Sequence, residues 1–148
     1  MPQSRALTPP PKARTVKLLF VADPLESFKT YKDSTYAMMR EAASRGHGLL
    51  ACEPRHVFWK TGGRVTATMR RIELTGDEAD WFRTLEEAPR ALADTGAIVM
   101  RKDPPFDSEY FYATHLLQQA EREGARVFNK PSALRDHPEK LAILEFPQ

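Results

Sequence analysis

The chain has 148 residues, of which 41% are hydrophobic and 28% charged, a balance that is ordinary for one compact globular domain. Its formal net charge of +2 comes from interleaved acids and bases, which argues against a nucleic-acid-binding surface. Its single cysteine, Cys52, excludes an intramolecular disulfide and a cysteine-based metal cluster, and no apolar run is long enough to span a membrane.

The chain divides into a tail, a domain and a connecting segment. Residues 1–14 contain three consecutive prolines and no apolar signal segment, so we expect a disordered tail. Residues 15–136 are predicted to form the domain, and residues 137–148 to begin a linker or helix. Cys52 is expected to be a small buried residue on a strand, which is consistent with a cytoplasmic protein.

The first half of the chain predicts a strand, a helix, a strand and a hairpin. Apolar runs at 16–22 and 48–53 are typical of buried strands. Asp33-Ser34 offers the amino-terminal cap of the helix between them, which Gly46 ends. The hairpin is expected from residues 57–60 and 64–74, because the tandem glycines between them favour a tight turn.

The second half adds two strands and a helix to a stretch without a clear pattern. Within residues 75–95, Trp81 and Phe82 are expected to pack and 91–93 to form a short helix. The remaining elements are predicted in this order: a strand at 97–100, a helix capped by Asp107-Ser108 and ended by Gly124, a strand at 126–129, a loop or single turn at 129–136, and the start of a helix at 139–146. This order predicts an α/β fold with a Rossmann-like, mainly parallel sheet, flanking helices and an extra β-hairpin.

Three loops of the predicted sheet carry more polar residues than plain connections need. Ligands of open parallel sheets bind at the carboxyl ends of the strands. The loops 23–34, 101–107 and 129–136 all leave such ends. We therefore expect them to converge on one binding site.

Arg101 and Lys102 directly follow a buried strand, in a turn stiffened by Pro104 and Pro105. The planar guanidinium group of arginine matches a carboxylate or a phosphate. The alternative is an ordinary surface ion pair with a neighbouring acid.

The helix start at Asp33-Ser34 also favours an anion, because free backbone N–H groups and the positive end of the helix dipole gather there. The alternative is that these residues only cap the helix. No metal-ligand spacing is found among the four histidines, and the dinucleotide fingerprint, the Walker A sequence and the nucleophile elbow are all absent from the sequence.

Several strings of the chain resemble, in order, the amino-terminal domain of prokaryotic glutathione synthetases, a pre-ATP-grasp domain. The strings are Asp23-Pro24, Lys32 to Met38, Met100 to Asp107, Asn129-Lys130-Pro131, Leu134-Arg135-Asp136 and Glu139-Lys140-Leu141. The most specific of them is Met-Arg-Lys-Asp-Pro-Pro-Phe-Asp.

The resemblance implies part of an ATP- and magnesium-dependent ligase that joins γ-glutamylcysteine to glycine. The cysteinyl carboxylate is first phosphorylated, and the glycine amine then attacks the acyl phosphate. Most of that machinery would lie in an ATP-grasp domain after Gln148. The 148-residue chain alone is therefore predicted to have no catalytic residue, metal site or bound cofactor, and no ligase activity.

The resemblance also implies roles for single residues. Substrate binding is implied for Arg101, Lys102, Asp33, Ser34 and Asn129. Lys140 would stand at the edge of the nucleotide site of the intact enzyme.

Two alternatives to a ligase domain share these sequence features. One is a stand-alone binding or regulatory module without catalysis. The other is an oligomerisation module, in which the strand edges of the hairpin 57–74 pair between copies. Since family members are oligomeric, a homo-oligomer is expected, without nucleic-acid or membrane partners.

Overall fold

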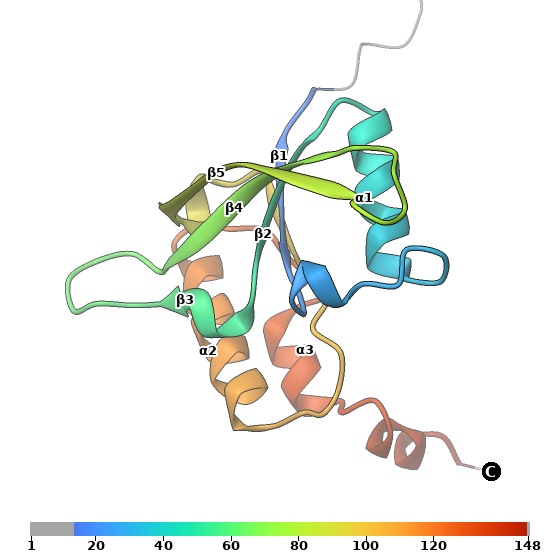
Figure 1. Cartoon of the computed structure of the whole chain (residues 1–148). Coiled ribbons are helices and arrows are strands. Elements are labelled where there is room, and N and C mark those ends of the chain that lie inside the picture. Colours follow the sequence, from blue (N-terminus) through green and yellow to red (C-terminus); the bar gives the residue numbers. More distant parts are fainter. Residues whose placement is uncertain (1–13, 148) are drawn as a thin grey trace, which may run out of the picture.

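A computed structural model describes residues 14 to 147 as a seven-stranded sheet with helices on both faces (Figure 1). The strands are β1 (Lys17–Val21), β2 (Gly48–Cys52), β3 (Val57–Phe58), β4 (Thr66–Leu74), β5 (Phe82–Ala91), β6 (Ala97–Met100) and β7 (Val127–Phe128). The helices are α1 (Ser34–Ser44), α2 (Ser108–Arg122) and α3 (Pro131–Asp136). The predicted α/β fold is confirmed, whereas the expected tail falls almost entirely outside the described residues.

The sheet has a parallel part and an antiparallel part. Strands β2, β1, β6 and β7 lie side by side in that order and run parallel. On the far side of β2, strand β4 runs antiparallel to β2, β3 and β5. The pairing of β3 with β4 confirms the predicted hairpin. Because β1, β6 and β7 are parallel, the three polar loops that follow them leave from the same edge of the sheet.

Alternate residues of the central strands supply two separate cores. On β1, Leu19 and Val21 face the side that α2 covers, where they pack with residues such as Leu117. Phe20 faces the opposite side and packs against Met39 of α1. All these side chains are almost completely buried. The period of two in β1 therefore fixes which helices cover which face.

Strand β5 corrects the prediction for residues 75–95, where no strand was expected. It pairs with β4 along the whole of Thr66–Leu74, with a bulge at Leu85. It was missed because most of its side chains are exposed, so it lacks the alternation of apolar and polar residues that marks a half-buried strand. Since β5 pairs with β4 along its whole length, the outer edge beside β4 belongs to β5, whereas the two-residue β3 of the hairpin pairs only with β4 within the described chain.

The packing expected around Trp81 is confirmed. Trp81 is buried in the core under α1, stacked on Phe28 at 5.5 Å between ring centroids and contacting Tyr36 edge-on at 5.1 Å. Phe82 lies against it at 4.7 Å. The aromatic cluster joins the loop after β1 to α1, so it fixes the start of that helix.

Smaller corrections concern three short elements. Residues 131–136 form the helix α3 rather than a loop or single turn, with Pro131 at its first position, where the missing N–H costs nothing. The helix expected at 139–146 is a 3-10 turn, Leu141–Glu145, whose apolar side chains are largely exposed and find no surface that would extend it. The short helix expected at 91–93 is a 3-10 turn at Leu92–Asp94.

Among the described residues, no helix is long and apolar enough to cross a lipid bilayer.

Cys52 is a buried free cysteine at the end of β2, as predicted. Burial, with a smaller contribution from the charge of Glu53, raises the pKa of its thiol to about 12. The thiolate is the reactive form, so we expect folded chain to react with a disulfide reagent at pH 8 more than about a hundredfold more slowly than unfolded chain. Because the thiol of the folded state stays protonated, the free energy of unfolding should also decrease as the pH rises from about 9 to 12. Equal reaction rates before and after unfolding would contradict this prediction.

Candidate functional site

The ends of β1 and β6 are joined by their backbones at the edge where the polar loops leave. The N–H of Arg101, the first residue after β6, donates to the carbonyl of Val21 at 2.7 Å. The N–H of Ala22 donates to Cys52 at the end of β2. Three parallel strands are thus held in register up to their last residues, which gives Arg101 a fixed starting point.

The Arg101 side chain reaches the first turn of α1. Its Nη2 donates to Ser34 Oγ at 2.7 Å, and its Nε donates to Thr35 Oγ1 at 3.1 Å. Both partners are neutral hydroxyls, and within residues 14–147 Arg101 forms no ion pair. The guanidinium charge is therefore held in place without being neutralised, as an anion-binding group requires.

The start of α1 is built by Asp33. Its carboxylate accepts from the N–H groups of Thr35 and Tyr36, at 2.8 and 3.0 Å. Asp33 therefore caps the helix, which was the alternative reading of this residue. Ser34 accepts from Arg101, so its own hydroxyl proton remains for a ligand.

A polar hollow of about 390 Å³ opens at this helix start, and we call it the α1 hollow. Its lining residues are Ser27, Lys29, Lys32, Asp33, Ser34, Thr35 and Asp103. Lys29 and Lys32 add positive charge to this lining, and Asp33 and Asp103 add an equal negative charge. The feature that favours an anion here is the guanidinium group of Arg101, which bonds Ser34 and Thr35 of the lining beside the amino-terminal end of the helix dipole.

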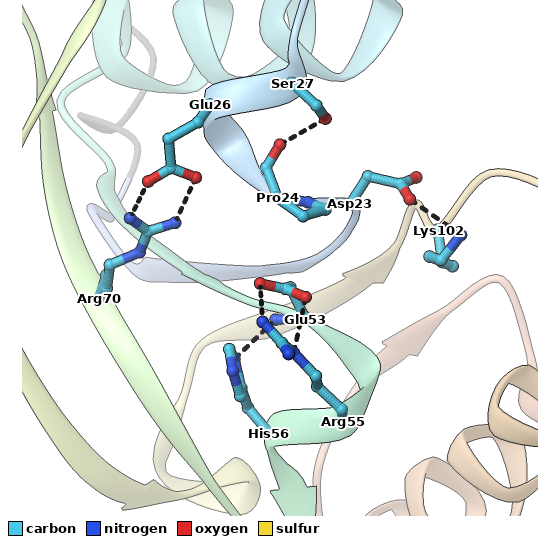
Figure 2. A network of polar contacts seen from close by, with 9 residues as sticks. All are labelled: Asp23, Pro24, Glu26, Ser27, Glu53, Arg55, His56, Arg70 and Lys102. Atoms are coloured by element: carbon cyan, nitrogen blue, oxygen red, sulfur yellow. Dashed lines mark hydrogen bonds and ion pairs between the residues drawn. The ribbon is translucent and has the colours of Figure 1, made fainter.

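Lys102 points to a different partner from Arg101. Its Nζ lies 2.8 Å from Asp23 Oδ1, and both side chains are mostly buried, with exposed fractions of 21% and 26%. Figure 2 shows this pair at the end of β1, beside the chain reversal at Pro24. For Lys102 the ion-pair alternative raised by the sequence is what the structure shows, whereas for Arg101 it is not.

Two further ion pairs stand near Asp23 and are drawn in Figure 2. Glu26 contacts Arg70 of β4 at 2.6 Å, and this bond holds the pKa of Glu26 below its usual value. Glu53 contacts Arg55 at 2.9 Å. These pairs line a hollow of about 420 Å³ beside the carboxyl ends of β1 and β2. Its charged groups largely satisfy one another.

Asn129 and Lys140, the other two residues expected at the site, lie apart from Arg101, Lys102 and the start of α1. Asn129 follows β7, whose Phe128 pairs with Val99 of β6, so it leaves from the same edge of the sheet. Its side chain is exposed and makes no hydrogen bond to another residue of the described chain. Lys140 lines a third, more apolar hollow of about 440 Å³, together with Lys102, Phe106 and Tyr110.

Two residues that contact Arg101 or Lys102 were not among the site residues expected from the sequence. Thr35 is buried and accepts from Arg101, and Asp23 binds the turn after β6. Asp23 stood directly after the first strand, which was a usable signal, but its partners are 79 and 80 residues away along the chain. Only the parallel pairing of β1 with β6 brings them together.

The described residues do not supply a metal site. Between residues 14 and 147, no group of three or more histidine, cysteine, aspartate or glutamate side chains could hold a metal ion. The expected anion site therefore rests on arginine, lysine and the helix start.

The chain matches a known protein family over most of its length. The family described as the prokaryotic glutathione synthetase, N-terminal domain, matches residues 16–135. This chain belongs to that family.

Three relatives show how much of a glutathione synthetase the chain represents. It is 54% identical to the glutathione synthetase of Ralstonia nicotianae over 133 residues, which cover 88% of this chain and 40% of that protein. The corresponding enzymes of Neisseria meningitidis serogroup B and Vibrio cholerae are 50% and 44% identical, and 42% of each is covered. The chain thus spans about two fifths of the length of the glutathione synthetases that it matches.

Proposed function

We propose that this chain is the substrate-positioning, amino-terminal part of a glutathione synthetase, an ATP-dependent ligase that joins γ-glutamylcysteine to glycine. The family membership supports the parent activity. The observation that carries the positioning role is the contact of Arg101 with the first turn of α1, in which a held but unneutralised cation stands beside a helix start. On this proposal, residues 137–148 connect the domain to the rest of the enzyme.

The anionic dipeptide is proposed to bind with a carboxylate against Arg101 and Ser34. The guanidinium group would donate hydrogen bonds to the carboxylate, and the Ser34 hydroxyl would donate its remaining proton. Lys29 and Lys32 stand in the same lining, where Asp33 and Asp103 balance their charge. Asp33 contributes by holding the helix start, and we propose Asn129 as a more distant contact at the same edge of the sheet.

The nucleotide is proposed to approach from the side of Lys140. This lysine and Lys102 line one hollow with two aromatic side chains, an arrangement that fits the edge of a nucleotide site. When bound, ATP supplies the phosphoryl group that activates the substrate carboxylate. Because the described residues offer no metal site, we assign them no step that involves magnesium. The free, buried Cys52 suits a reducing compartment, and we expect the parent enzyme to act in the cytoplasm as a homo-oligomer.

A domain exchange tests this proposal. Residues 16–135 of this chain would replace the matching segment of the Ralstonia nicotianae enzyme, and glutathione formation from γ-glutamylcysteine, glycine and ATP would be measured. We expect a rate within about tenfold of the parent, since 54% identity preserves the core. A folded hybrid, verified by its circular dichroism and thermal unfolding, that forms no glutathione would overturn the assignment.

A further inference from the structure

Asp23 connects the two loops that meet at the proposed anion site. One of its oxygens, Oδ1, lies 2.8 Å from Lys102 Nζ, and the other, Oδ2, accepts from the backbone N–H of Asp103 at 2.9 Å. Lys102 Nζ also donates to the carbonyl of Asp103 at 2.9 Å. Asp23 thus binds the turn after β6 through both a side chain and the backbone.

The residues that Asp23 binds directly follow Arg101. The backbone of Arg101 is fixed on the other side by its hydrogen bond to Val21, two residues before Asp23. The first part of the turn is therefore tied to the end of β1 at two points, Arg101 and Asp103. A guanidinium group on such a turn loses little conformational freedom when it binds a ligand.

The Asp23–Lys102 pair differs from the other ion pairs of the described chain in being shielded from water. It is the only one in which both side chains are less than 30% exposed. Burial by itself would lower the pKa of Lys102, but the hydrogen bond and charge of Asp23, with the charges of Asp107 and Asp103, raise it. The charged form of Lys102 is therefore favoured by its acidic neighbours in spite of burial.

From this geometry we infer that Asp23 is a positioning residue: it fixes the turn after β6 so that Arg101 points at the start of α1, and it occupies Lys102 so that Arg101 is the cation presented to the substrate carboxylate. This inference rests on the proposed function for its substrate. It assigns Arg101 the direct contact with the substrate and Lys102 a supporting role in the turn after β6.

The test compares two substitutions of Asp23 with a matched control in the 148-residue chain. Asp23→Ala removes both bonds, whereas Asp23→Asn removes the ion pair and keeps an acceptor for the Asp103 N–H. The control is Glu26→Gln, on the same loop, which removes a short ion pair to Arg70 without touching the turn after β6. By calorimetry, we expect γ-glutamylcysteine to bind about tenfold more weakly to Asp23→Ala, about threefold more weakly to Asp23→Asn, and unchanged to Glu26→Gln.

A double-mutant cycle separates positioning from a general loss of stability. If Asp23 acts through Arg101, then Asp23→Asn should have no further effect on binding once Arg101 is already alanine. Additive losses in the double variant would overturn the inference.

A measurement without ligand separates this inference from the proposed function. Hydrogen exchange of the Arg101 Nε–H, which is bonded to Thr35, should be about tenfold faster in Asp23→Ala than in the wild type, and unchanged in Glu26→Gln. Faster exchange in a chain that binds no dipeptide would refute the substrate but uphold the role of Asp23. Unchanged exchange would refute that role whatever the chain binds.

Discussion

Replacement of Arg101 by alanine is expected to weaken the binding of γ-glutamylcysteine by about 10- to 100-fold. Hydrogen bonds between charged groups contribute about 1.5–3 kcal/mol, and the guanidinium group is the one held cation at the start of α1 that forms no ion pair with another described residue. Calorimetric titration of the chain gives the affinity directly. In the domain-exchanged enzyme, the same substitution should appear mainly as a higher KM for the dipeptide.

Two companion variants sharpen this result. Arg101→Lys keeps the charge but loses the fork that reaches Ser34 and Thr35 together, so it should restore only part of the affinity. Arg45→Ala is the matched control, because Arg45 lies after the other end of α1 and pairs with Glu41 at 2.7 Å on the exposed surface. Unchanged affinity in Arg101→Ala, or an equal loss in Arg45→Ala, would refute the proposed anion site.

Replacement of Gly96 by alanine should destabilise the fold by about 1–3 kcal/mol. A Cβ atom at Gly96 would lie 2.5 Å from Cβ of Val16 and 3.0 Å from the carbonyl oxygen of Lys17. Real atoms do not approach this closely, so β6 would have to move away from β1 where the two strands begin to pair. Urea unfolding followed by circular dichroism measures the change.

Gly48 of β2 provides the control, because it lies on the other side of β1. A Cβ atom there would meet only Lys17, with its Cγ at 3.4 Å and its Cα at 3.9 Å, which are ordinary contact distances. We expect Gly48→Ala to change the free energy of unfolding by less than about 0.5 kcal/mol or to raise it slightly. Equal free energies of unfolding for the two variants would contradict the claim that the fold needs a residue without a Cβ atom at position 96.

The parallel half of the fold was predictable because its strands are buried on both faces. Runs such as 16–22 and 97–100 are apolar almost throughout, and Asp33 and Asp107 cap the two long helices as the sequence indicates. Strand β5 was not predictable from its residues, because Glu86, Glu87 and Pro89 disfavour a strand when read alone. Its partner β4 provides the hydrogen bonds that decide its conformation.

The candidate site also has a part that was predictable from the sequence and a part that was not. Local chemistry pointed to Arg101 and to the start of α1, and both lie at the shared edge of the sheet. What local chemistry did not distinguish was which of two adjacent cations forms an ion pair. Arg101 and Lys102 are neighbours in the chain, yet only Lys102 meets Asp23. That difference depends on side-chain directions after β6, which no pattern of residue types encodes.

The edge of the sheet formed by β5 bears on how copies of this chain can meet. Leu85 interrupts the regular backbone pattern, Pro89 lacks a donor, and charged residues occupy much of the remaining length. A neighbouring molecule would find no continuous row of donors and acceptors on which to add a strand of its own. Addition of a strand at β5 is therefore disfavoured, and concentrated solutions of the chain should not form cross-β fibrils through this strand.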